Sequence, residues 1–213
     1  ETSVAEHTFA LILAISRKIP QSVKPVDREF DQSEITGFDL KGKTLGVIGS
    51  GKIGLEVIKI AKGFGMEVIV YDVVFNNKAK KELGYEYVSL DELLRASDIV
   101  SVHAPYNKHT FHMLNRDNLF ILKNGAVLIN TSRGELIESK ALLAGLKNGK
   151  VRFAGLDVLE EGSKANKELL EMENVFVTPH NAANSIESKR KVLEETIANL
   201  EGFIKGDKRN VVE

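Results

Sequence analysis

The 213-residue sequence has no cysteine, which excludes a disulfide framework, a thiolate metal site and a cysteine nucleophile. It has no excess of either charge, since 29 Lys and Arg oppose 30 Asp and Glu, and it has no long basic run. Neither nucleic acid nor an anionic membrane surface is therefore indicated as a partner. The longest apolar run, Phe9–Ile15, is too short to span a bilayer, and we expect no signal peptide. These absences favour a cytoplasmic protein, whose 43% hydrophobic content is enough for one substantial core.

The most informative stretch runs from Lys43 to Asp72. It begins with a β-branched apolar run, Lys43–Ile48, typical of a strand buried on both faces of a parallel sheet. The sequence GSGKIG follows at once, then about eleven residues with helical spacing of apolar side chains. A second buried strand, Met66–Tyr71, ends at Asp72. This order of strand, glycines, helix, strand and acid is typical of a dinucleotide-binding unit.

Each part of this unit suits that ligand. Gly49 allows a tight turn, Gly51 lets the backbone approach a pyrophosphate, and Gly54 lets the helix pack closely on the strand. The helix N-terminus offers N–H groups and a favourable dipole to the phosphates. Asp72 would accept hydrogen bonds from ribose hydroxyls and repel a 2′-phosphate, which predicts NAD rather than NADP. The alternative is that the glycines serve only as turns.

The remainder of the sequence alternates between helix and strand patterns. This alternation predicts an α/β fold, a doubly wound parallel sheet of the Rossmann type flanked by helices. The helices are expected at 77–83, 89–92 onward, 115–122, 138–146 and 185–205. The further strands are expected at 85–88, 98–104, 125–130, 151–156 and 174–178.

Residues Val4–Ile19 predict a helix that is apolar on nearly all sides and is ended by Pro20 and Pro25, with a polar, irregular segment up to Phe38. One interpretation is a helix packed on its own core. We favour an arm buried against a second subunit, because such a helix needs more cover than one sheet face supplies. We expect one NAD-binding domain over residues 1–213. It comprises an N-terminal helix and dimerisation arm (1–40), a Rossmann core (41–184), and a C-terminal helix and tail (185–213).

Polar residues follow several predicted strands, and ligands bind at the carboxyl ends of such strands. Arg133 has the fork geometry to bind a carboxylate, or it pairs with a surface acid. His180 is suited to proton exchange, or it is a hydrogen-bonded core histidine. Asp157 is suited to accept from a carboxamide, or it is a turn carboxylate. His103 is interpreted as structural or adjacent to the cofactor.

His109 and His112 lie three residues apart but lack a third ligand nearby, so no metal site is expected. The full set of predicted cofactor-binding residues includes neighbours of those already discussed. It consists of Gly49, Gly51, Lys52, Ile53, Gly54, Asp72, His103, Ala104, Pro105, Thr110, Thr131, Ser132, Arg133, Asp157, His180 and Ala182. Arg133 and His180 form the predicted catalytic pair.

Eight blocks of sequence occur in a characteristic order: SVAEHTFALIL, KTLGVIGSGKIG, VYD, HAP, NTSRGELI, AGLDV, VTPHNA and NVV. In this respect the chain resembles the NAD-dependent D-2-hydroxyacid dehydrogenases, which include lactate, glycerate and phosphoglycerate dehydrogenases. The resemblance implies hydride transfer between NADH and a 2-keto acid. It implies that Arg133 holds the substrate carboxylate, His180 is the acid/base, and Asp157 faces the nicotinamide carboxamide. It also implies that Lys52-Ile53 cover the pyrophosphate and that Ala104-Pro105 and Thr131-Ser132 line the cofactor.

Two departures from the family pattern limit this expectation. The family has a glutamate five residues after the aspartate of the LDV block, where it pairs with the histidine, but Gly162 occupies that position here and Ser163 follows. Glu160 and Glu161 are out of register. The family's substrate domain is also expected to be largely missing. We therefore predict cofactor binding with little or no turnover. The alternatives are a non-enzymatic NAD-sensing scaffold, similar to related co-repressors, and an engineered isolated domain.

Overall fold

Seven short, mostly β-branched segments build one parallel sheet in a computed structural model that describes residues 1–23, 33 and 35–211. Every described pair of neighbouring strands is parallel, in the order β3-β2-β1-β4-β5-β6-β7. The strand order reverses between β1 and β4, and sheets of this kind bind their ligands at the carboxyl ends of the strands beside such a reversal. The strands are β1 (Thr44–Ile48), β2 (Glu67–Tyr71), β3 (Glu86–Tyr87), β4 (Ile99–Val102), β5 (Ala126–Asn130), β6 (Val151–Leu156) and β7 (Val175–Val177).

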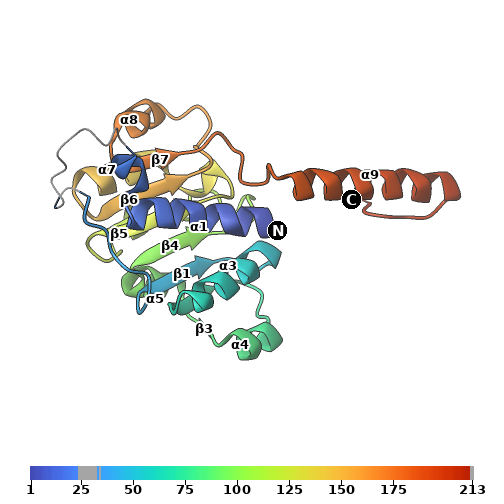
Figure 1. The fold of residues 1–213 in the computed structure, drawn as a ribbon, viewed down its shortest axis with the longest axis horizontal. Helices are drawn as coiled ribbons and strands as arrows, with labels where there is room; N and C mark the ends of the chain where they lie inside the picture. Colours follow the sequence, from blue (N-terminus) through green and yellow to red (C-terminus); the bar gives the residue numbers. More distant parts are fainter. Residues whose placement is uncertain (24–32, 34, 212–213) are drawn as a thin grey trace.

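Helices cover both faces of this sheet (Figure 1). One face carries α1 (Thr2–Ser16), α3 (Lys52–Gly63) and α4 (Asn77–Leu83), over a core that includes Leu45 and Val47 of β1. The other face carries α5 (Leu90–Ala96), α6 (Arg116–Leu119), α7 (Ser139–Lys147) and α8 (Ala165–Glu171), over a core that includes Ile48. The predicted fold class is therefore confirmed: a doubly wound parallel sheet with an N-terminal helix.

The first helix ends earlier than predicted. α1 stops at Ser16, where the N–H of Phe38 donates to the Ser16 carbonyl at 2.8 Å and the returning chain blocks further helix. Pro20, which has no N–H to donate to the Ser16 carbonyl, lies in the first turn of a separate short helix, α2 (Ile19–Ser22), just after the helix that it was predicted to end. The predicted stop at Pro25 lies outside the described residues.

The apolar side of α1 is covered by its own chain. Ala5, Phe9, Ile12 and Ile15 are buried, in the core that the helix shares with α3 and with strands β5 and β6. These contacts match the interpretation of a helix packed on its own core. The buried side of α1 therefore offers no apolar surface for a second subunit to cover.

The long C-terminal helix has the opposite character. α9 (Ile186–Lys205) extends away from the sheet, and Gly202 is its one buried residue (Figure 1). Its large apolar side chains are exposed, namely Ile186, Val192, Leu193, Ile197, Leu200, Phe203 and Ile204. None of the helices in the described residues combines the length and apolarity needed to cross a bilayer.

Several local predictions are confirmed. Gly84 ends α4 in the left-handed conformation, with φ of 64°, and Ser89 and Glu92 form the predicted capping box of α5. The helix expected over 115–122 is shorter, and α8 was not predicted from the sequence. Lys164 precedes α8 without a side-chain cap, so the usual starting signal is absent.

Candidate functional site

The turn from β1 into α3 needs glycine at two positions for reasons internal to the chain. Gly49 has φ of 95°, and a Cβ there would lie 2.8 Å from the carbonyl carbon and oxygen of His103. A Cβ on Gly54 would lie 2.0 Å from the Gly49 carbonyl oxygen. At Gly51, by contrast, a Cβ would meet no described atom within 4 Å. The described residues make no steric demand for glycine at position 51, and its predicted role beside a pyrophosphate stays a prediction.

The N-terminus of α3 opens beside this glycine. Gly51 is its N-cap residue, and no side chain caps the helix. Its first N–H groups are therefore left for another acceptor, and its dipole favours an anion. Lys52 is exposed and Ile53 is half-buried in the first turn. An open approach and an uncapped helix end fit the pyrophosphate of a dinucleotide.

Asp72 follows β2 directly and is tied to the same turn. Its Oδ2 accepts from the Ser50 N–H at 2.6 Å and from the Ser50 hydroxyl at 2.9 Å, and its Oδ1 accepts from the Val74 N–H at 2.9 Å. Burial acts to raise the pKa of Asp72, but the hydrogen bonds from Val74 and Ser50 outweigh it and lower that pKa below its ordinary value. The group is thus an ionised, acceptor-only carboxylate beside the glycine turn.

The residues after β4 form the next part of the edge. The imidazole of His103 lies 2.8 Å from the Ser101 hydroxyl. Burial lowers the pKa of His103 to about 4, although its side chain keeps partial exposure, so the ring is neutral at physiological pH. Thr110 closes the loop by donating its hydroxyl to the Pro105 carbonyl at 2.6 Å. Ala104 is buried and Pro105 is exposed.

Beyond β5 the chain links two neighbouring strand ends. The Ser132 hydroxyl donates to the Ala104 carbonyl at 3.0 Å, which joins the ends of β5 and β4. The buried Thr131 hydroxyl lies 2.9 Å from that of Thr8 in α1. Arg133 is exposed and forms no ion pair with any described residue, so its guanidinium does not pair with a surface acid there.

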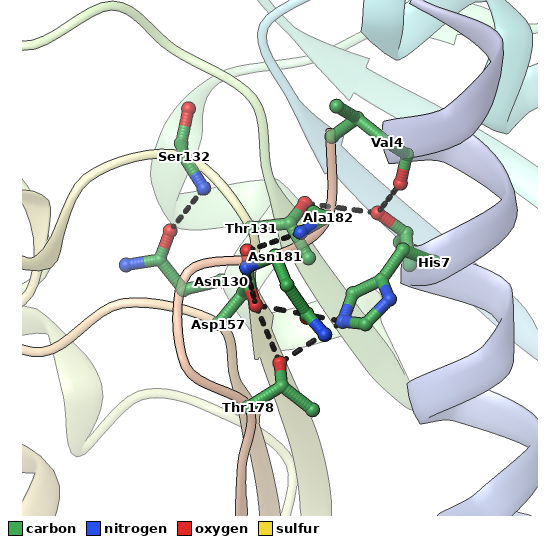
Figure 2. A network of polar contacts seen from close by, with 10 residues as sticks. Val4, His7, Asn130, Thr131, Ser132, Asp157, Thr178, Asn181 and Ala182 are labelled. Carbon is green, nitrogen blue, oxygen red and sulfur yellow. Dashed lines mark hydrogen bonds and ion pairs between the residues drawn. The ribbon is translucent and has the colours of Figure 1, made fainter. Parts of the chain in front are cut away.

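Asp157 organises the turn that follows β7 (Figure 2). Its buried carboxylate accepts from the Thr178 hydroxyl and from the N–H groups of Asn181 at 3.0 Å and Ala182 at 2.9 Å. The imidazole Nε2 of His7 lies 2.9 Å from the Thr178 hydroxyl and 3.5 Å from Oδ1 of Asp157. These contacts are those of a turn carboxylate. The predicted contact with a nicotinamide carboxamide stays a prediction.

His180 sits on that turn. Its φ of 52° places it in the left-handed region, and its N–H donates to the carbonyls of Asp157 and Thr178, each at 2.9 Å. The side chain is exposed rather than part of the core, and no described carboxylate lies within 4 Å of its ring. The backbone thus presents the ring outward without an orienting acid.

Glu160, two residues before Gly162 in the sequence, forms hydrogen bonds with residues other than His180. Its Oε1 lies 2.8 Å from the His112 imidazole, and its Oε2 accepts from the Ser139 N–H at 2.9 Å. Burial acts to raise the pKa of Glu160, but these hydrogen bonds, from Ser139 first, lower it. Gly162 is exposed, with φ of 70°. Among the described residues, no group of three or more His, Asp or Glu side chains is arranged to hold a metal ion.

Three polar residues of α1 were missed in the sequence. His7 reaches Thr178 and Thr8 reaches Thr131, while the Ser3 hydroxyl lies 2.8 Å from that of Ser185 at the start of α9. α1 therefore touches three segments of the site (Figure 2 shows two of them). The sequence contained a signal for these contacts, because the polar pair His7-Thr8 lies inside an otherwise apolar helix, where buried polar side chains need hydrogen-bond partners.

The contacts form a continuous row along one sheet edge. They run from Asp72 to Ser50, from the His103 N–H to the Ile48 carbonyl at 2.7 Å, from Ser132 to Ala104, and from the Asp157 N–H to the Asn130 carbonyl. A separate hollow of about 210 Å³ lies at the opposite edge and includes none of the predicted site residues. The structure thus brings the predicted residues to one edge, and their individual roles stay predictions.

The sequence model of one protein family, the NAD-binding domain of D-isomer specific 2-hydroxyacid dehydrogenases, matches residues 9–182. The chain belongs to this family. The resemblance seen in the sequence is therefore confirmed, and with it NAD as the cofactor of the domain. The uncapped α3 and the open space at Gly51 fit that cofactor.

Individual similar proteins support the same family assignment. The chain is 40% identical to the glyoxylate reductase of Thermococcus litoralis, over 96% of this chain and 64% of that protein. It is 42% identical to the D-3-phosphoglycerate dehydrogenase of Methanocaldococcus jannaschii, over 88% of this chain and 36% of that protein. Among solved structures, the D-lactate dehydrogenase of Aquifex aeolicus with NAD and lactic acid superposes with a TM-score of 0.89 at 41% identity, covering 96% of this chain and 67% of that chain. The chain thus spans about 64% of the length of the glyoxylate reductase.

Proposed function

We propose that this chain holds NAD(H) for hydride transfer between NADH and a 2-keto acid, and that by itself it binds the cofactor with little or no turnover. The observation that carries the proposal is the continuous row from the glycine turn and Asp72 to Arg133 and His180. The names of the similar proteins, a glyoxylate reductase and a D-lactate dehydrogenase, support a small 2-keto acid as the substrate class.

Each end of the row has a proposed task. The N–H groups at the start of α3 bind the pyrophosphate, and Asp72 accepts from the adenosine ribose. Arg133, exposed and without an acidic partner among the described residues, binds the substrate carboxylate through its fork. His180, whose ring is also exposed, donates the proton to the carbonyl oxygen during reduction. The bound nicotinamide supplies the hydride.

Low turnover follows from the surroundings of His180. A general acid works best when a partner fixes the ring and favours the imidazolium. Glu160 is committed to His112 and Ser139, and Gly162 offers no carboxylate. Both Arg133 and His180 are exposed in this chain, so water is not excluded from the reacting groups.

A homodimer through residues 1–40 is part of the proposal, as is a cytoplasmic location. α1 keeps Val4, Ala10 and Leu13 at least partly exposed, which gives a second copy some apolar surface to cover. Sedimentation velocity tests the dimer: Leu13→Lys should shift the chain to the mass of a monomer. A wild-type chain that sediments as a monomer over the whole concentration range would reject it.

The test of cofactor binding is calorimetric titration of NADH and of NADPH into the purified chain. The proposal expects NADH to bind and NADPH to bind much more weakly, with Asp72→Ala narrowing the difference. The same preparation, given NADH with glyoxylate or pyruvate, should show little NADH oxidation. Absence of NADH binding would overturn the cofactor role, and rapid oxidation would overturn the claim of low turnover.

A further inference from the structure

A cluster of hydroxyl groups stands behind Asp72, on the side of the edge strand β3. The Tyr87 hydroxyl lies 3.0 Å from the Ser50 hydroxyl and 3.2 Å from the Tyr85 hydroxyl, and it accepts from the Asn76 N–H at 2.9 Å. The Tyr87 ring is packed between two others, since the Phe75 ring lies 4.6 Å away and the Tyr85 ring 5.3 Å away, centroid to centroid. The position of its hydroxyl is therefore tightly determined.

Counting donors fixes the direction of the hydrogen bonds between Asp72 and Tyr87. An ionised carboxylate only accepts, so the Ser50 hydroxyl must donate its single hydrogen to Oδ2 of Asp72. Ser50 can then take part in its contact with Tyr87 only as acceptor, and Tyr87 donates to it. Because Tyr87 donates its one hydrogen to Ser50, it can only accept from the Asn76 N–H and from the Tyr85 hydroxyl, and the single hydrogen of Tyr85 has a second acceptor in the Asn76 carbonyl at 3.4 Å.

The result is a chain of hydrogen bonds that all run the same way, from the Tyr87 hydroxyl through the Ser50 hydroxyl to the carboxylate of Asp72, with the Tyr85 hydroxyl beside its first member. Burial, together with the hydrogen bond to Tyr87, raises the pKa of Tyr85, so it stays a donor at physiological pH. Such aligned chains strengthen each bond they contain. Asp72 forms no ion pair with any described residue, so it is held by this chain and by backbone N–H groups, among them those of Ser50 and Val74.

We propose that Tyr87 is a positioning residue for cofactor selectivity: through Ser50 it fixes Asp72 so that this carboxylate accepts a ribose hydroxyl and rejects a 2′-phosphate. The inference rests on the proposed binding of NAD(H) at the glycine turn. Oδ2 already accepts two hydrogen bonds from Ser50, whereas Oδ1 accepts one, from Val74. We therefore assign Oδ1 to the ribose, and the hydrogen bonds from Ser50 to Oδ2 fix the orientation of the carboxylate.

Loss of the Tyr87 hydroxyl leaves Ser50 free to rotate and Asp72 less well fixed. Ionised Asp72 then meets the ribose in a spread of orientations, and NADH binding weakens. NADPH gains nothing from a fixed Asp72, so its binding is unchanged or slightly tighter. The ratio of the two dissociation constants is the quantity that Tyr87 controls.

The experiment compares Tyr87→Phe, Ser50→Ala and the double variant with the wild-type chain by titration of NADH and NADPH, with the Tm of each recorded. Tyr87→Phe should weaken NADH binding about three- to tenfold, the usual range for one hydrogen bond, and lower the selectivity ratio to match. In the Ser50→Ala background the same change should add nothing, because Tyr87 acts through Ser50. Tyr85→Phe is the matched control, since it keeps the Tyr87–Ser50 bond.

The outcomes separate this inference from the function it rests on. If the wild-type chain binds no NADH, the proposed function fails and Tyr87 has no role to test. If the wild-type chain binds NADH selectively and Tyr87→Phe keeps the same ratio, the role of Tyr87 is wrong. Equal weakening of both cofactors, or a full additional loss in the Ser50→Ala background, also refutes it, because a merely structural residue would behave in that way.

Discussion

Replacing Asp157 by Asn tests the turn that carries His180. The carboxylate accepts from two N–H groups and one hydroxyl, spread over both of its oxygens, and its side chain is buried. An Asn side chain has one acceptor oxygen, so its NH₂ group must face at least one of these donors. A buried N–H without an acceptor costs about 1–3 kcal/mol. For a domain of this size, a loss of about 2 kcal/mol lowers the Tm by about 4–8 °C.

The assay is thermal unfolding of Asp157→Asn and Asp157→Ala beside the wild type. Asp157→Ala should destabilise more, because it leaves both N–H groups without an acceptor. Asp207→Asn is the control: that aspartate is exposed, and the change should stay within about 0.5 kcal/mol. A Tm for both Asp157 variants within about 1 °C of the wild type would refute the reasoning, since an unmet buried donor must show in the free energy of unfolding.

Three further predictions concern other parts of the chain. Gly51→Ala should leave the Tm nearly unchanged, since the added Cβ meets open space, yet it should weaken NADH binding in a titration. Gly54→Ala should lower the free energy of unfolding by about 1–3 kcal/mol or more, because its Cβ would overlap the Gly49 carbonyl oxygen. The pKa of His103 is lowered to about 4 in the folded chain, against an ordinary 6.5, so the unfolded chain binds a proton at a higher pH than the folded chain does. The free energy of unfolding should therefore fall as the pH drops from 6.5 towards 4, by at most about 3 kcal/mol from this group. A series of Tm measurements over this pH range should show a smaller change for His103→Gln than for the wild type. Ile197→Ser and Leu200→Ser should each change the free energy of unfolding, measured with urea, by less than about 0.5 kcal/mol, since these side chains are 48% and 59% exposed.

The sheet was largely predictable because its strands are buried on both faces and therefore read as continuous apolar runs. The predicted strand over 151–156 has the observed bounds, and those around Ile48 and Tyr71 differ by one residue. The strand-end positions of Asp72 and Asp157 follow from this accuracy. Local signals also sufficed at Gly84, where a helix ends in a left-handed residue.

What the sequence did not show depends on contacts between distant segments. α1 ends at Ser16, whose carbonyl cannot accept from Pro20, the residue four positions on, and accepts instead from the N–H of Phe38, a contact that the local sequence does not show. The cover of α1 by its own sheet also depends on the assembled fold, and the predicted contact of this helix with a second subunit stays a prediction. The hydrogen bonds of Glu160 with His112 and Ser139 join two loops and the start of α7, which are separate in sequence.

The polar contacts of α1 bear on the order in which the chain folds. Thr8 meets Thr131 across 123 residues, His7 meets Thr178 across 171, and Ser3 meets Ser188 across 185. Closing loops of that length is entropically unfavourable until strong local structure has formed. α1 precedes every strand in the sequence, yet its docking sites exist only after β6 and β7 have joined the sheet. Although it precedes all seven strands, α1 is therefore expected to be among the last helices of this domain to reach its native place, and until then its apolar side needs protection from aggregation.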